Sequence, residues 1–175
     1  MTTNHGAGSE AGSSPGLGDI PGGRPDSLDA LDVLVGTWEM EASFEAGKFG
    51  PGSPAVTARS ASTVFEWLEG RWFLVQRFTS QNPAAPSGIA IIGPAATPAA
   101  TLKQHYFDSR GVARIYETAL DGRTWTVWRE APGAWQRYTG TVSADGSEIV
   151  GAWEMSRDGR HWTRDFGLRY IRVVE

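Results

Sequence analysis

Cysteine is absent from this chain of 175 residues. Without thiols the protein can form no disulfide, no thiolate metal site and no cysteine nucleophile. Histidine is also scarce, with three residues and no pair at metal-ligand spacing. We therefore expect neither a metal site nor a cofactor.

Lysine occurs only at Lys48 and Lys103, so arginine supplies the rest of the 16 basic residues, against 20 acidic ones. A net charge of −4 without a basic run makes nucleic acid or an anionic membrane a poor partner. The chain has no run of 18 apolar residues and no signal-peptide pattern. A cytoplasmic protein is the expectation.

The composition indicates one globular domain after a disordered tail. Residues 1–25 are rich in Gly, Ser and Pro and nearly lack large apolar groups, so they cannot bury enough surface to offset ordering. The rest of the chain, 26–175, is long enough to bury a core.

A short helix is predicted where this domain begins, with Asp26 or Ser27 as its cap. Its leucines recur every third residue, at Leu28, Leu31 and Leu34.

After Gly36 the apolar period changes to two, which is typical of strands with one buried face. Ten strands are predicted, near 37–45, 56–67, 71–80, 87–93, 102–107, 112–120, 123–131, 134–143, 147–157 and 161–173. Closure of the meander would remove its two exposed edges. We therefore predict an all-β fold, an antiparallel up-and-down barrel of about ten strands with a short N-terminal capping helix.

Some local patterns resemble those of a known superfamily. Gly36-Thr37-Trp38 follows the helix and opens the first strand, and Arg172 lies near the end of the last strand. This arrangement is similar to calycins, in which a Gly-x-Trp motif packs against an arginine of the closing strand. The runs at 65–70 (FEWLEG) and 106–111 (YFDSRG) resemble lipocalin-like bacterial families of unknown function. The resemblance implies a ligand-holding barrel, related in architecture to nitrobindin and fatty-acid-binding-protein-like barrels.

Glycine turns divide the second half of the chain at intervals of 11, 11, 13 and 13 residues, from Gly111 to Gly159. Such turns between β-rich runs predict hairpins, and two-residue loops fix which side chains share a face. Pairing outward through five hairpins gives one coherent interior face. Its aromatic members are Tyr116, Trp125, Tyr138, Trp153, Trp162 and Phe166, and its polar members are His105, Arg114, Arg129, Gln136 and Arg164.

Three arginines without a carboxylate on this face call for a counter-charge, because an unpaired charge out of water costs several kcal/mol. A ligand anion, water or a carboxylate from the first half could supply it. Glu66 is the first carboxylate to consider, but the hairpin around Glu69-Gly70 favours Thr63, Phe65 and Trp67 inside, which places Glu66 outside.

The main hypothesis is a binding protein for an apolar or aromatic small molecule with an anionic or carbonyl end. Its body would contact Tyr116, Tyr138, Trp125 and Trp153. Its polar end would contact Arg164, Arg129, Arg114 and Gln136, because arginine presents forked donors. Arg164, mid-strand beside Trp153, is the strongest candidate.

A second hypothesis is a cofactor-free cyclase, isomerase or lyase in the same cavity. His105 would act as acid or base, and Arg114 and Arg129 would stabilise an oxyanion. No nucleophile or carboxylate dyad supports catalysis, which favours binding. A third hypothesis is a structural or interaction barrel.

Haem binding of the nitrobindin kind is disfavoured. Nitrobindin-like proteins hold the iron with a histidine near the last strand, and the stretch 162–166 here has none. The neighbouring His161 falls on the outward face. Trp128 and Trp135 also face outward, which allows a homodimer that covers them.

Overall fold

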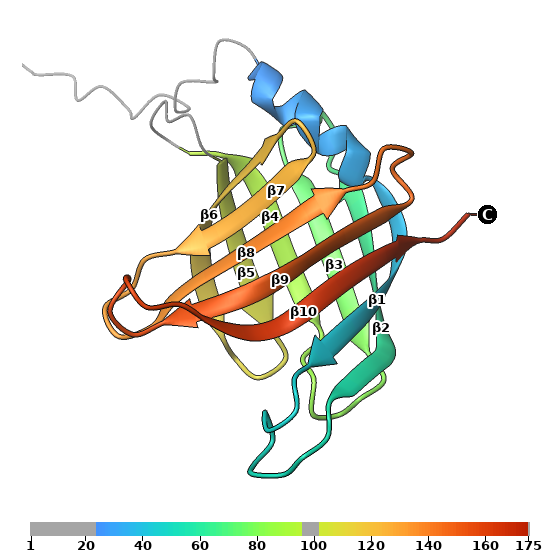
Figure 1. Cartoon of the computed structure of the whole chain (residues 1–175). Helices are drawn as coiled ribbons and strands as arrows, with labels where there is room; N and C mark the ends of the chain where they lie inside the picture. The colour runs from blue at the N-terminus through green and yellow to red at the C-terminus, as the bar shows by residue number, and fades with distance from the viewer. Residues whose placement is uncertain (1–23, 96–101, 175) are drawn as a thin grey trace, which may run out of the picture.

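The computed structural model describes residues 24–95 and 102–174; most of the expected tail lies outside them. Ten antiparallel strands form a closed barrel in the order β1-β10-β9-β8-β7-β6-β5-β4-β3-β2 (Figure 1). The strands are β1 Gly36–Phe44, β2 Val56–Trp67, β3 Leu74–Ser80, β4 Gly88–Pro94, β5 Leu102–Asp108, β6 Ala113–Asp121, β7 Thr124–Arg129, β8 Trp135–Val142, β9 Glu148–Ser156 and β10 Thr163–Arg172. The predicted all-β barrel with a short N-terminal helix is confirmed.

One end of the barrel is covered by η1, a 3₁₀ helix over Asp26–Leu34 (Figure 1). Its three leucines at 28, 31 and 34 are fully buried. The three-residue spacing suits a helix with three residues per turn, which places them on one side. Pro25 occupies the N-cap position without a side-chain hydrogen bond, so the expected Asp26 or Ser27 cap is wrong.

Trp38 and Arg172 join this helix to the first and last strands. The Trp38 indole donates to the Leu34 carbonyl at 2.8 Å, and the Arg172 guanidinium lies 4.1 Å from the centre of the Trp38 ring. Arg172 also donates to the carbonyls of Val33, Val35 and Gly146. Burial lowers the pKa of Arg172. Among the described residues its N–H groups donate to these three carbonyls and not to a carboxylate. The expected stacking of Arg172 on Trp38 is confirmed.

The glycine turns predicted two hairpins in the register that the structure shows. Val127 pairs with Tyr138 across β7 and β8, and Tyr138 pairs with Trp153 across β8 and β9. The β6–β7 and β2–β3 hairpins are shifted by two residues, so Thr118 pairs with Val127 and Thr63 with Phe78. A shift of two keeps every side chain on its predicted face.

The predicted face of β5 is wrong. Tyr106, not His105, pairs with Arg114, so His105 and Phe107 lie on the outer wall and are exposed. The turn has three loop residues instead of two, because the Asp108 amide donates to the Val112 carbonyl. An odd loop moves the whole strand by one position and inverts its faces.

The predicted start of β10 is also wrong. Arg164 pairs with the outward Glu154, whereas Phe166 pairs with the inward Trp153, so a bulge at residue 165 separates them. Arg164 therefore lies outside the barrel, half-exposed, with its Nε 3.8 Å from a Glu45 carboxylate oxygen. Trp162 is also outside, with the Arg137 guanidinium 4.1 Å from its ring centre.

The half of the barrel next to η1 is filled with side chains. Trp125 and Tyr138 are 2% and 1% exposed, and their ring centres are 5.4 Å apart. The Tyr138 ring lies over Gly140 and Gly151, where a Cβ on Gly151 would meet the ring at 2.8 Å. Inward glycines at these two positions thus make room for an inward tyrosine.

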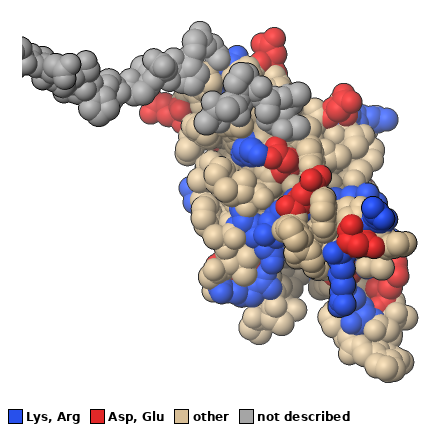
Figure 2. Space-filling view, turned by 90° about the vertical axis from the view of Figure 1, so that its left-hand side faces the viewer, with Lys and Arg blue, Asp and Glu red and all other residues tan. Residues whose placement is uncertain are grey.

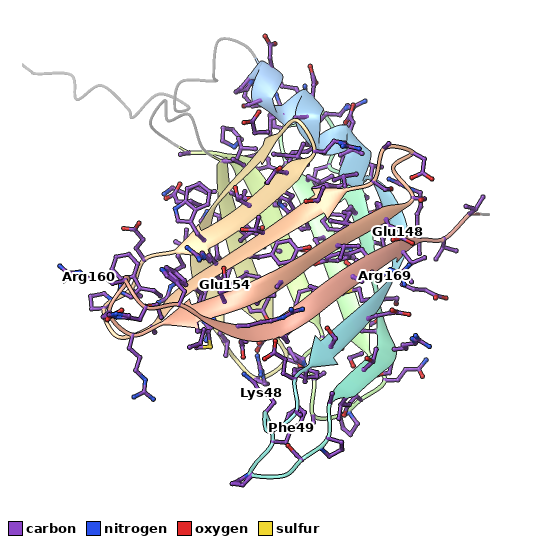
Figure 3. The ribbon with its side chains drawn as sticks, in the orientation of Figure 1. Lys48, Phe49, Glu148, Glu154, Arg160 and Arg169 are labelled. Atoms are coloured by element: carbon purple, nitrogen blue, oxygen red, sulfur yellow. The ribbon has the colours of Figure 1, made fainter. Side chains whose placement is uncertain are left out.

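The outer wall carries paired charges. Arg169 of β10 binds Glu148 of β9, and Arg137 donates to Glu154 at 2.7 Å; Glu148, Arg169 and Glu154 are labelled in Figure 3. Glu66 is on the outer wall, as expected, and accepts from Arg77 at 3.0 Å. Acidic and basic side chains are also spread over the face shown in Figure 2. No helix in the described ranges is long and apolar enough to cross a membrane.

Candidate functional site

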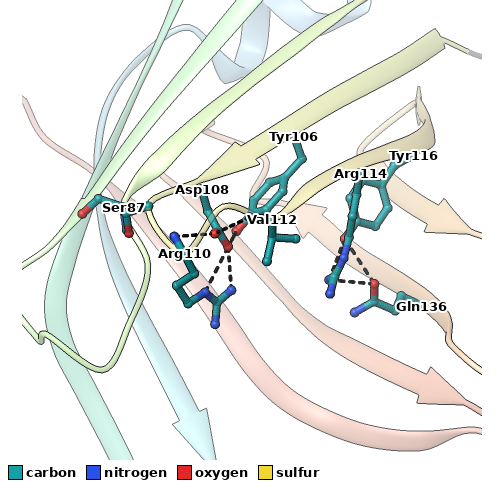
Figure 4. Close-up of polar contacts among 9 residues, drawn as sticks. Ser87, Tyr106, Asp108, Arg110, Val112, Arg114, Tyr116 and Gln136 are labelled. Carbon is teal, nitrogen blue, oxygen red and sulfur yellow. Dashed lines mark hydrogen bonds and ion pairs between the residues drawn. The ribbon is translucent and has the colours of Figure 1, made fainter.

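A cluster of three polar side chains lies inside the barrel, near the end away from η1. Arg114 and Tyr116 come from β6 and Gln136 from β8 (Figure 4). The Arg114 Nη1 donates to Gln136 Oε1 at 3.0 Å, and the Tyr116 hydroxyl donates to the same oxygen at 3.2 Å. Arg114 Nη1 also lies 3.4 Å from the Tyr116 hydroxyl. We call these three residues the distal cluster.

The short strand β7 explains how residues of β6 reach β8. Pairing between β6 and β7 covers five residue pairs, from Asp121↔Thr124 to Glu117↔Trp128. Residues 113–116 of β6 have no paired neighbour on β7 in this register. Side chains from this part of β6 can therefore meet the side chain of Gln136 at the start of β8.

Arg114 has no acidic partner: among the described residues, no carboxylate oxygen lies within 4.0 Å of its guanidinium. Its hydrogen-bond partners, Gln136 and Tyr116, are both neutral. Arg129, the register partner of Gln136 at the end of β7, likewise has no ion pair with a described residue, but it lines a pocket with the outer-wall residues Lys103 and Glu117. The distal cluster is thus a site of unneutralised positive charge.

A second network beside the cluster has its charge neutralised internally (Figure 4). The Asp108 carboxylate, whose side chain is fully buried, accepts from Arg110 Nη2 at 2.6 Å and from the Tyr106 hydroxyl at 2.8 Å. It also accepts from the backbone amides of Arg110 and Val112. The hydrogen bonds from Arg110, together with that from Tyr106, hold the pKa of Asp108 well below its usual range. Asp108 is therefore a fixed structural anion.

Tyr106 is held in the same network. Its burial, and then the neighbouring Asp108 carboxylate, raise the pKa of its hydroxyl, which stays protonated at neutral pH. Its ring stacks on Phe78, with centres 5.5 Å apart. The sequence-based interpretation assigned no site role to Tyr106, Asp108 or Arg110. The signal was in the YFDSRG run, where an aspartate directly before a turn is flanked by a tyrosine and an arginine two residues away on either side.

An aromatic wall connects the two networks to the core. The Tyr106 and Tyr116 ring centres are 6.3 Å apart, and those of Tyr116 and Trp153 are 5.8 Å apart. Tyr116 contacts Arg114, and Trp153 packs against Tyr116, both on the inward face predicted for them. Such edge-to-face rings form a rigid apolar surface next to the charge.

The other residues predicted to bind the ligand lie elsewhere. Trp125 and Tyr138 face inward as predicted and are buried in the hydrophobic core, the cluster that also includes Tyr116. The Tyr138 hydroxyl is buried and has no hydrogen-bond partner among the described residues, and burial raises its pKa. Arg164 and His105 are on the outer wall, so the structure does not bring them to the distal cluster.

A pocket of about 590 Å³ lies at the rim of the barrel, lined by Gly133, Met155, Ser156, Arg157, Asp158, His161 and Thr163. Met155 is the register partner of Gln136, but Arg114, Tyr116 and Gln136 are not among the residues that line this pocket. His161 is 89% exposed, and its Nδ1 lies 2.6 Å from an Asp158 carboxylate oxygen, which raises the pKa of His161. It lies in a surface turn before β10, so it is exposed as predicted but not part of the strand that was predicted to begin at residue 161. The described residues contain no group of three potential metal ligands.

The chain matches no protein-family model and no curated protein sequence. Among solved structures it is similar to Rv2717c from M. tuberculosis, with a TM-score of 0.57 and 15% sequence identity. The match covers 86% of this chain and 99% of the other. At this identity the likeness shows a shared barrel fold.

Proposed function

We propose that this barrel binds a small apolar or aromatic molecule with an anionic or carbonyl end at the distal cluster. The observation that carries the proposal is Arg114, which lies inside the barrel with two neutral partners and, among the residues that the structure describes, no carboxylate partner. The ligand's polar end would receive hydrogen bonds from Arg114, and its body would lie against Tyr116 and Trp153. This is the usual composition of a small-molecule site, an apolar surface with a few placed polar groups.

We also propose that the protein is a distant calycin-like barrel. The support is the packing of Arg172 on Trp38 behind a glycine. Gly36 has φ +127°, and a Cβ there would meet Arg172 Nη1 at 2.8 Å. This is the arrangement that the Gly-x-Trp resemblance implies.

No catalytic function is proposed. The acid–base mechanism required His105 on the same face as Arg114 and Arg129, and His105 is on the opposite face. Asp108 is a poor replacement, because its lowered pKa makes the carboxylate a weak base, and its hydrogen-bond partners among the described residues all donate to it.

The fluorescent probe 1-anilinonaphthalene-8-sulfonate tests the proposed site, because it combines flat rings with one anionic group. We expect it to bind the wild-type protein, and Arg114→Met to weaken binding by about 1.5–3 kcal/mol, since a charge-assisted hydrogen bond is lost. This corresponds to roughly a ten- to 150-fold rise in Kd, measured by fluorescence titration. Methionine retains an apolar stem at this position.

Arg77→Met is the matched control, because Arg77 is on the outer wall and pairs with Glu66. Its Kd should stay within about twofold of wild type, as expected for a surface change away from the site. Equal Kd values for Arg114→Met and the wild type would contradict the proposed site.

A further inference from the structure

The distal cluster has an unused hydrogen-bonding edge. An arginine carries five N–H donors. In the described part of the chain, Nη1 of Arg114 makes the hydrogen bonds, to Gln136 and Tyr116, and Nε and Nη2 make none. The Nε–Nη2 edge is the side of a guanidinium that binds a carboxylate through two parallel hydrogen bonds.

Gln136 holds Arg114 without neutralising it. Its Oε1 accepts from both Arg114 and Tyr116, so the amide fixes the position of the guanidinium. A glutamate has nearly the same shape as glutamine and would place a negative charge at the same oxygen. The amide at residue 136 therefore leaves the full positive charge of Arg114 available to a ligand.

Three carboxylates on the strands around the cluster are engaged with other basic residues. Asp108 binds Arg110, Glu117 binds Lys103 on the outer wall, and Glu154 binds Arg137. Arg129, the register partner of Gln136 on the intervening strand β7, is basic and so supplies no negative charge.

We infer that Gln136 is the residue that determines the charge of the ligand, and that the site selects an organic carboxylate over the uncharged carbonyl compound of the same shape. This inference rests on the proposed function and narrows it from an anionic or carbonyl end to a carboxylate. The carboxylate occupies the Nε–Nη2 edge of Arg114, while Gln136 keeps its hydrogen bond to Nη1. A neutral carbonyl makes hydrogen bonds there but leaves the charge of Arg114 uncompensated.

The test compares 2-naphthoate with 2-naphthamide, which share a ring system and differ in charge, by isothermal titration calorimetry at pH 7. The wild-type protein should bind 2-naphthoate at least about tenfold more tightly, because hydrogen bonds between charged groups are the stronger ones. In Gln136→Glu the new carboxylate pairs with Arg114, so the preference should fall to about twofold or less, with 2-naphthamide binding retained.

Gln136→Met is the second variant, because it removes the amide without adding charge. It should keep a preference of at least about fivefold for 2-naphthoate, since the charge of Arg114 remains uncompensated. Thermal unfolding of all three proteins establishes that each is folded at the temperature of the titration.

Three outcomes would overturn the inference in distinguishable ways. Equal binding of the two compounds by the wild type leaves the proposed binding site standing and shows that it does not select charge. A preference for 2-naphthoate that persists in Gln136→Glu shows that another residue sets it. Binding of neither compound contradicts the proposed function together with the inference.

Discussion

Gly140 and Gly151 show how single residues shape the interior. They are register partners on β8 and β9, both inward, and the Tyr138 ring lies over them. A Cβ on Gly151 would also meet Gly140 Cα at 2.6 Å, too close for either backbone to accept without moving. The missing side chains are thus part of the packing of an aromatic core.

Gly151→Ala is expected to lower the free energy of unfolding by about 1–3 kcal/mol, as for other overpacked cores. Urea denaturation followed by tryptophan fluorescence would measure this. Ala152→Ser, one residue away on the outer face, should change the value by less than about 0.5 kcal/mol. A Gly151→Ala protein as stable as the wild type would show that the Tyr138 ring and the neighbouring backbone can both move aside.

Among the elements, η1 acts as an apolar plug, because its three leucines are fully buried at the end of the barrel. Polar contacts also hold it: Trp38 and Arg172 donate to its last carbonyls and to Val35, and Trp67 and Arg71 donate to the Asp32 carboxylate. Burial of the three leucines adds an apolar contribution to this attachment.

Leu31→Ala should lower the free energy of unfolding by about 2–5 kcal/mol, since it removes a large buried side chain. Leu68→Ala, at a position 43% exposed in the β2–β3 turn, is the control and should cost much less. Differential scanning calorimetry of the two variants provides the comparison. If the two variants melted at the same temperature, η1 would not contribute to the folded barrel.

The accuracy of the sequence-based predictions at this scale depended on the length of each turn. Strand positions could be predicted because alternation and Asp-Gly turns are local properties of the chain. Which face of a strand is buried depends on whether a loop has an even or odd number of residues. The Asp108 side chain, which accepts from the Arg110 and Val112 amides, stabilises the odd loop that turned His105 outward.

The bulge at residue 165 likewise reversed the face predicted for Arg164 at the start of β10. It is stabilised by a tertiary contact, the ion pair of Lys48 with Asp165 at 2.5 Å, which pattern alone does not reveal. The distal cluster could be predicted in part, because Arg114, Tyr116 and Gln136 lie on strands whose faces were predicted correctly. Their mutual contact could not, because it depends on where β7 ends.

At the scale of the whole molecule, the aspartates of the turns make the stability of the fold depend on pH in the acidic range. Hydrogen bonds from Ser143, then from Ser147, lower the pKa of Asp145 to about 2 from an ordinary value of 3.8. A group with a lowered pKa in the folded state stabilises the protein above its unfolded pKa and loses that effect as pH falls through the folded pKa. Asp108 and Asp158, whose pKa values are lowered further, act in the same direction at more acidic pH.

The melting temperature should therefore fall as the pH is lowered from about 4 to about 2. Asp145→Asn should show a smaller fall over this interval, because the amide keeps an acceptor oxygen but does not titrate. Thermal unfolding followed by circular dichroism at several pH values would measure the difference. An equally large fall in melting temperature in the variant and in the wild type would contradict the assignment to Asp145.

The early end of β7 has a consequence for the dynamics of the barrel. Where strands are paired, backbone hydrogen bonds protect amides from exchange with solvent, but residues 113–116 of β6 have that protection from β5 alone. The wall at this seam is completed by the side chains of Arg114, Tyr116 and Gln136 instead. A molecule bound to these side chains would reduce local opening of this part of the barrel wall. Slower amide exchange in β6 would therefore report that the site is occupied, without any knowledge of what occupies it.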